Sequence, residues 1–158
     1  MTDYAKLADI AELKMIADRT AVERHRELRA ASCTFFEGVK ARLADEMNKA
    51  NTELRKKKVP TIDRLHLANF DEEVFLTYGT DSLCRVGLGI MSGGCRITAV
   101  ISGPPNGYEI SRREYLCVQE ASCSEVLHLV GAELTTVVAC PDEIAVNIIS
   151  GILVGKFN

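Results

Sequence analysis

The first 58 residues place apolar side chains at helical spacing. Thr2 or Asp3 is a suitable N-cap, and an apolar stripe begins just after it. The charged segment 23–27 interrupts the stripe, which then resumes with a mean step of about 3.7 residues. This pattern predicts an amphipathic helix over residues 3–57. The stripe consists of Leu7, Ile10, Leu13 and Ala17 and, after the interruption, of Leu28, Ala31, Phe35, Val39, Leu43, Met47, Ala50 and Leu54.

The second part of the stripe does not follow a heptad. Steps of seven from Leu28 and Phe35 reach Arg42 and Lys49, which are charged. A left-handed coiled coil needs apolar residues every 3.5 positions, so this segment predicts a packing helix and not a leucine zipper.

The length of this helix leaves two alternatives. A continuous helix over residues 3–57 would be about 80 Å long at 1.5 Å per residue, whereas a 100-residue globule has a radius of gyration of about 13 Å. Either the helix folds back near residues 23–27 into a hairpin, or another chain covers the overhanging stripe. Because neither Gly nor Pro marks a turn there, we expect self-association as a homodimer or a larger oligomer.

From Val59-Pro60 onward the pattern changes to alternation with period two, which predicts strands. Short turn segments separate them, so we expect an antiparallel meander of four or five strands. In the last of these strands charged and apolar residues share one face, which predicts an edge strand or a β-bulge. The expected strands are Ile62–Phe70, Val74–Tyr78, Ser82–Met91, Cys95–Ser102 and Tyr108–Val118.

The C-terminal part contains one ambiguous segment and two clearer ones. Residues 122–131 fit either a helix that begins with a capping box at Ser122 and Glu125 or a further strand. Leu134–Ala139 is rich in β-branched residues and predicts a strand. Pro141 followed by two acidic residues predicts the start of a helix. That helix is apolar nearly all round, so we expect it to be deeply buried or part of an interface.

The fold class that follows is α+β: a long N-terminal helix or helical hairpin, an antiparallel β-meander and a C-terminal apolar helix. We expect a helical arm at 1–58 and an α+β globular domain at 59–158. The side-chain charge is +3 in the first part and −6 in the second, and all four Pro and ten of the eleven Gly lie in the second. This asymmetry supports the division.

Composition also indicates the cellular compartment in which we expect the chain. The first thirty residues are too charged for a signal peptide, and the longest uncharged apolar run, at residues 144–155, is shorter than the roughly 20 residues that a spanning helix needs. The six cysteines contain no Cys-x-x-Cys pair. We therefore expect a cytoplasmic chain with reduced thiols, with neither a membrane anchor nor a bound metal.

Motifs that could carry chemistry have simpler structural interpretations. The glycines Gly87, Gly89, Gly93 and Gly94 precede a strand and not a helix, so they do not form a dinucleotide-binding loop, and we expect no cofactor. No cysteine is placed beside a histidine by the sequence. The basic run Arg55–Lys58 complements the negative end of the long helix, and the globular part is acidic, which argues against nucleic-acid binding.

The leading functional hypothesis is a non-enzymatic, self-associating interaction or scaffold module whose partners are a second copy and another protein. The alternative is a small enzyme or ligand-binding domain with a polar site on the β-meander. The expected interaction residues are Leu28, Phe35, Val39, Leu43, Met47 and Leu54, and the candidate ligand-binding residues are Arg96, Tyr108, Arg112 and Glu114. No catalytic constellation emerges from the sequence.

Overall fold

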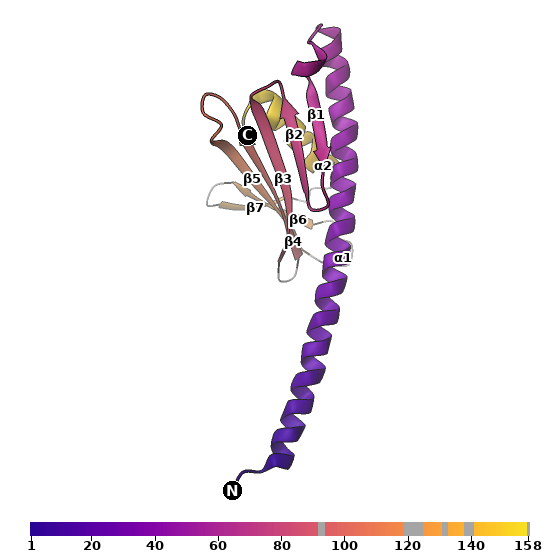
Figure 1. Cartoon of the computed structure of the whole chain (residues 1–158), viewed down its shortest axis with the longest axis vertical. Helices are drawn as coiled ribbons and strands as arrows, with labels where there is room; N and C mark the ends of the chain where they lie inside the picture. The colour runs from indigo at the N-terminus through magenta and orange to yellow at the C-terminus, as the bar shows by residue number, and fades with distance from the viewer. Residues whose placement is uncertain (92–93, 119–124, 131–132, 138–140, 158) are drawn as a thin grey trace.

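The structure is a computed structural model that describes residues 1–91, 94–118, 125–130, 133–137 and 141–157. It confirms the α+β class: a long N-terminal helix, an antiparallel meander and a C-terminal helix (Figure 1). The helices are α1 (Tyr4–Lys56) and α2 (Pro141–Val154), with a short 3-10 helix η1 (Thr61–Asp63). The strands are β1 (Leu65–Asn69), β2 (Glu73–Tyr78), β3 (Ser82–Met91), β4 (Gly94–Ser102), β5 (Glu109–Val118), β6 (Glu125–Val130) and β7 (Glu133–Val137).

Helix α1 is one continuous helix of 53 residues, so the hairpin alternative is wrong. The Asp3 side chain accepts a hydrogen bond from the Lys6 backbone N–H at 3.2 Å and caps its start. At the other end, Lys58 has a left-handed φ of 61°, and the Val59 N–H donates to the Leu54 carbonyl at 3.0 Å. Helix α1 therefore ends at Lys56, a few residues before Pro60, which could not continue the helix.

The strands form one sheet in the order β1-β2-β3-β4-β5-β6-β7, with every neighbouring pair antiparallel. The expected strands between residues 62 and 118 are present as β1 to β5, and β6 and β7 extend the sheet beyond them. Residues 125–130 form a strand, so the helical alternative for this segment is wrong. The remainder of 122–131, at 122–124 and 131, lies outside the described residues.

Two details of the strands bear on the sequence-based expectations: the start of β1 and the irregular pairing of β5. Residues 61–63 form η1 where a strand was expected from Ile62, because Pro60 sets a helical φ and its carbonyl accepts from the Asp63 N–H at 3.0 Å. In β5 the register shifts so that Ile101 lies opposite Ser111 and Ser102 opposite Glu109. This bulge confirms one of the two alternatives. β5 is not an edge strand, since β4 and β6 pair with it on either side.

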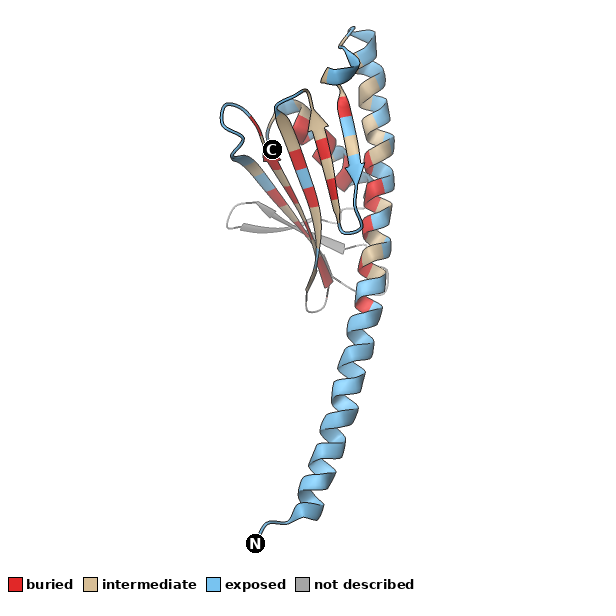
Figure 2. Cartoon of the chain, viewed as in Figure 1, coloured by how far each residue is buried: buried red, intermediate tan, exposed pale blue. Residues whose placement is uncertain are grey.

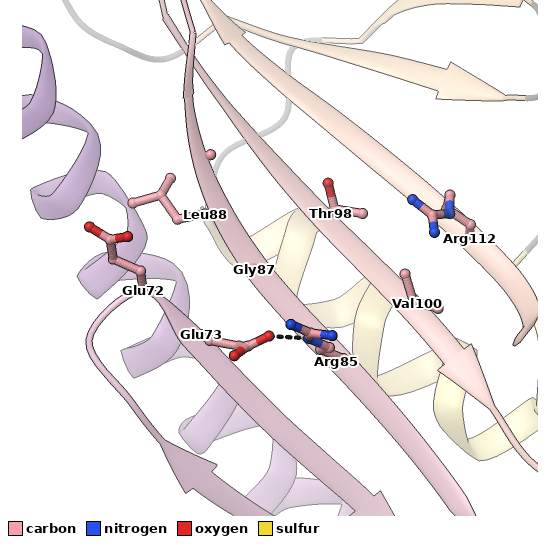
Figure 3. Close-up of a pocket in the computed structure, with 9 residues that line it drawn as sticks. Glu72, Glu73, Arg85, Gly87, Leu88, Thr98, Val100 and Arg112 are labelled. Atoms are coloured by element: carbon pink, nitrogen blue, oxygen red, sulfur yellow. Dashed lines mark hydrogen bonds and ion pairs between the residues drawn. The ribbon is translucent and has the colours of Figure 1, made fainter. Parts of the chain in front are cut away.

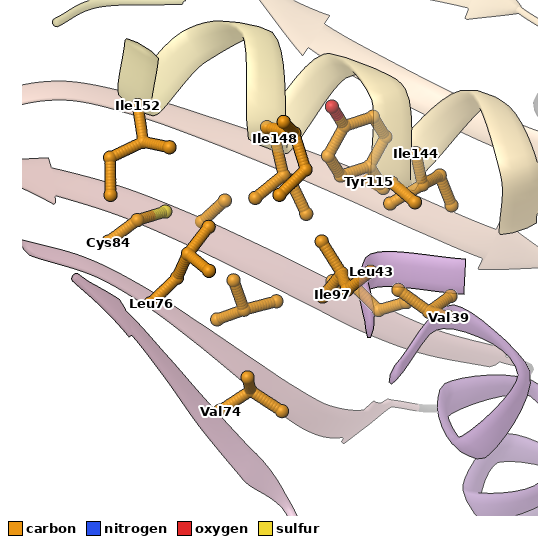
Figure 4. Close-up of a cluster of buried hydrophobic side chains, with 14 of the residues drawn as sticks. Val39, Leu43, Val74, Leu76, Cys84, Ile97, Tyr115, Ile144, Ile148 and Ile152 are labelled. Atoms are coloured by element: carbon orange, nitrogen blue, oxygen red, sulfur yellow. The ribbon is translucent and has the colours of Figure 1, made fainter. Parts of the chain in front are cut away.

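One face of the sheet carries the hydrophobic core, on which α2 and residues 28–56 of α1 pack (Figure 2). We call residues 28–56 the core half of α1. Alternate strand residues point to this face, as the two-residue period requires. Fully buried side chains come from all these layers, and Figure 4 shows several of them: Val39, Leu43, Val74, Leu76, Cys84, Ile97, Tyr115, Ile144, Ile148 and Ile152.

Helix α2 buries one side and exposes the other. Ile144, Ile148 and Ile152 are fully buried against the core, whereas Val146 and Val154 are exposed. The helix begins at Pro141 as expected. Across the described residues, neither α1 nor α2 combines the length and the apolar character that a membrane-spanning helix requires.

Candidate functional site

Two surfaces of the described chain remain uncovered by its own core. The first is the N-terminal part of α1, residues 4–27, which we call the arm. The second is the face of the sheet opposite the core, which we call the open face.

The arm projects beyond the globular part, and none of its residues belongs to the described hydrophobic core (Figure 2). Every residue from 1 to 27 is exposed, and burial begins at Leu28. At 1.5 Å per residue the arm is about 36 Å long. Its exposed large apolar side chains are Tyr4, Leu7, Ile10, Leu13, Met15, Ile16 and Val22.

The arm carries both signs of charge within single helical turns. Lys14 and Asp18 form an ion pair at 3.0 Å, and Arg26 lies 3.5 Å from Glu23. Each pair is solvent-exposed and therefore contributes little to stability.

The expected interaction residues lie mostly inside the chain's own fold. Val39 and Leu43 are fully buried in the core, and Leu28 is buried at its lower edge. Phe35 and Met47 are half-buried against the core. Leu54, near the end of α1, is half-buried. The apolar surface that stays exposed on α1 is therefore the first part of the stripe, N-terminal to these six residues.

On the open face, three of the four candidate ligand-binding residues form one cluster, in which two arginines lie beside the Glu114 carboxylate. Glu114 on β5 lies 3.9 Å from the Arg96 guanidinium of β4 and 3.8 Å from that of Arg112. Arg112 also donates to Glu109 at 2.6 Å. Tyr108 precedes β5 and is 72% exposed, so it stands apart from this cluster at the strand end.

Beside this cluster the open face forms a hollow of about 480 Å³ (Figure 3). Its floor is formed by Gly87 and Gly89 of β3, where no side chain fills the space. Arg112 lies on one side, and the ion pair of Arg85 with Glu73 lies on the other. The remaining lining residues are Glu72, Leu88, Thr98 and Val100.

The glycines of this hollow are not required by the backbone. Neither Gly87 nor Gly89 has a positive φ, and a Cβ added at Gly87 would meet no atom within 4 Å. Glycine in the interior of a strand weakens it, and it often marks a place where a ligand or another backbone approaches closely. The sequence showed these glycines, but only the register of β3 shows that they share the open face with Arg85 and Arg112.

The buried titratable groups lie on the core face. Burial raises the pKa of the Cys84 thiol to about 12, so this thiol stays protonated near neutral pH. Burial also raises the pKa of Tyr115. Among the described residues, no three His, Cys, Asp or Glu side chains come together as a metal site would require. Comparison of the chain with protein-family models, curated proteins and solved structures finds no match.

Proposed function

We propose that this chain is a non-enzymatic, cytoplasmic interaction module that associates with itself through the arm of α1 and presents its globular part to a further protein. The observation that carries the proposal is the arm itself. It is a helical segment about 36 Å long that exposes seven large apolar side chains and packs on no described part of the chain.

Exposed apolar surface of this extent favours association. Soluble monomers rarely expose contiguous apolar patches larger than a few hundred Å². A second copy offers the same surface, and two-fold pairing is the commonest symmetry by which such a surface covers itself. The arm is nearly neutral, with five Lys and Arg against six Asp and Glu in residues 1–27. Its net charge therefore opposes pairing only weakly.

Light scattering of the purified full chain at micromolar concentration tests this proposal. We expect a mass of about twice the 17.3 kDa of one chain. A mass that stays at 17.3 kDa up to 100 μM or so would contradict self-association.

The hollow on the open face supports a second candidate function, a ligand-binding domain. Its supporting observation is the pair of glycines that form the floor without a backbone reason. The ring of charges around it contains Arg85, Arg112, Glu72 and Glu73. These groups would bind a small polar ligand that carries hydrogen-bond acceptors.

A substitution at Gly87 separates this candidate from the first. Gly87→Leu should place its side chain in the hollow, because nothing lies within 4 Å of an added Cβ. The probe is a thermal-shift panel of small carboxylates and phosphates. A saturable rise in Tm that the wild type shows and Gly87→Leu lacks would support ligand binding. No rise with any compound would count against it.

A further inference from the structure

One line of positions along the arm carries a charged pair between apolar residues. Successive positions separated by three and four residues lie on one line along the helix, as the a and d positions of a coiled coil do. From Tyr4 this line continues without a break to the end of the arm, and the side chains on it are all exposed. The line consists of Tyr4, Leu7, Ala11, Lys14, Asp18, Ala21 and His25.

The residues that flank this line are mainly apolar, and those on the opposite side are mainly polar. Ala8, Ile10, Met15, Ala17 and Val22 occupy the two flanking rows. Most of the charged residues, such as Lys6, Asp9, Glu12, Arg19 and Glu23, lie on the far side. Leu13 and Ile16 are exceptions and lie among them. The side of the arm that carries the line is therefore mainly apolar, with one charged pair, Lys14 and Asp18, at its centre.

When two copies of this line run in opposite directions, complementary residues lie opposite one another. If two arms run antiparallel with the two-fold axis at residue 16, residue i lies opposite residue 32 − i. Lys14 of one arm then faces Asp18 of the other, twice by symmetry. Ala11 faces Ala21, which allows close approach of the helices, and Leu7 faces His25.

A parallel, in-register pair has the opposite property. Lys14 would face Lys14, Asp18 would face Asp18, and the two His25 side chains would meet. Like charges placed opposite one another across an interface disfavour that arrangement. A polar residue at a core position of a helix pair commonly determines its register and orientation.

We propose that two copies of this chain pair antiparallel through their arms, with Lys14 and Asp18 of both copies forming a four-residue charge cluster at the two-fold axis. This inference rests on the proposed self-association and specifies its geometry. The 3.0 Å Lys14–Asp18 pair within each chain places every lysine between two carboxylates in the dimer. The two globular parts then lie at opposite ends of the paired arms.

Cysteine cross-linking of the full chain tests the orientation. A disulfide needs Cα atoms about 4.4–6.8 Å apart. In the antiparallel dimer, Ala11 of one copy lies opposite Ala21 of the other, so the distance between their Cα atoms comes close to this range. Two Ala11 residues would be separated by ten residues along the axis, or about 15 Å. The variants Ala11→Cys and Ala21→Cys are made separately, then mixed and oxidised. Mass spectrometry maps the linked peptides and distinguishes links between the introduced cysteines from links that involve native cysteines.

We expect the 11–21 link in the mixture and no 11–11 link in Ala11→Cys alone. An 11–11 link in a protein of dimeric mass would overturn the antiparallel arrangement while leaving self-association intact. A monomeric mass of the wild type with no link would overturn both.

Charge reversal tests the central cluster. Lys14→Asp places four carboxylates at the axis and should weaken the dimer about tenfold or more. Adding Asp18→Lys should restore most of the affinity. The matched control is Lys6→Asp, which makes the same change of net charge on the far side of the arm. Equal weakening by both single variants, or no weakening by either, would overturn the proposed cluster.

Discussion

The side-chain amide of Asn51 satisfies both backbone hydrogen-bonding groups of Leu65. Its nitrogen donates to the Leu65 carbonyl, and its oxygen accepts from the Leu65 N–H, each at 2.9 Å. Leu65 lies at the start of β1, the edge strand of the sheet, and pairs on its other side with β2. Asn51 of α1 thus makes the two hydrogen bonds that a neighbouring strand would otherwise make with Leu65.

Asn51→Ala should lower the free energy of unfolding by about 1–3 kcal/mol, because it leaves both groups of Leu65 without a protein partner. Urea unfolding measures the change. The control is Asn48→Ala one turn earlier, where the side chain is exposed, and where we expect a change within about 0.5 kcal/mol. Equal losses in both variants would contradict a specific contribution of the two hydrogen bonds to Leu65.

Lys40 joins α1 to the turn between β1 and β2. Its ammonium group donates to the carbonyls of Phe70 at 2.7 Å and Asp71 at 3.1 Å, and it pairs with Glu37 at 2.8 Å. Lys40→Met should therefore cost about 1.5–3 kcal/mol of unfolding free energy, as expected for hydrogen bonds from a charged donor.

Lys49 is a close control for Lys40. It forms the same pair with a glutamate three residues earlier, Glu46 at 2.9 Å, but its side chain is 74% exposed against 8% for Lys40. Lys49→Met should change the free energy of unfolding by less than about 0.5 kcal/mol. Matching melting temperatures for the two Met variants would show that the turn contacts of Lys40 contribute nothing.

Phe35 and Phe36 are adjacent but differ in burial. Phe36 is fully buried, whereas Phe35 packs at the edge of the core. Phe36→Ala should cost about 3–5 kcal/mol, as a large-to-small core substitution does, and Phe35→Ala clearly less. Calorimetric melting of both variants checks the order, and a reversed order would contradict the placement of α1 on the sheet.

Stability should fall at alkaline pH because of Cys84. Its pKa of about 12 lies above the value of 9.0 for an unperturbed thiol. Between these values the unfolded state has lost a proton that the folded state keeps, so unfolding becomes more favourable as pH rises. Below pH 9 this difference vanishes.

Urea unfolding of the wild type and Cys84→Ala between pH 8 and about 10.5 measures this effect. The wild type should lose stability more steeply, so the difference between the two proteins should shrink with pH. The raised pKa of Tyr115 acts in the same direction, but it is common to both proteins. Two curves that stay parallel would refute the contribution of Cys84.

Ile10 and Ile16 test which side of the arm pairs. They are 56% and 53% exposed, respectively, but Ile10 flanks the apolar line and Ile16 lies on the far side. Ile10→Lys should weaken the dimer by at least about tenfold, and Ile16→Lys should leave it close to wild type. Analytical ultracentrifugation measures both. A stronger effect of Ile16→Lys would place the interface on the other side of the helix.

The sequence pattern predicted elements well where periodicity was strong. The strands at 82–91 and 94–102 and the helix from Pro141 follow directly from alternation and from the residues that start a helix. The pattern placed Phe35 and not Phe36 on the stripe, yet Phe36 is fully buried and Phe35 only partly, because the sheet that α1 packs on determines which one faces the core. Residues 61–63 were missed because a proline-initiated turn precedes the alternating pattern of β1.

The sequence predicted the candidate sites less completely than it predicted the helices and strands. Arg96, Tyr108, Arg112 and Glu114 were predicted as polar groups of a site on the β-meander, and the structure brings all but Tyr108 together. Arg85 and Gly87 join the same surface only through the register of β3 with β2 and β4. The charged segment 23–27 divides the apolar stripe into two parts, but the pattern did not show that only the second part is buried, and packing shows that burial begins at Leu28.

The continuity of α1 has a consequence for the kinetics and energetics of assembly. The costly step in forming a helix is its first turn, and each further residue adds at a much smaller cost. Because the core half is held helical by the sheet and α2, the arm extends an existing helix. Two such chains therefore meet as preformed rods and lose little backbone entropy on association. Dilution to monomer should leave the far-ultraviolet circular dichroism per residue nearly unchanged, whereas the chains of a zipper that folds only on dimerisation would unfold.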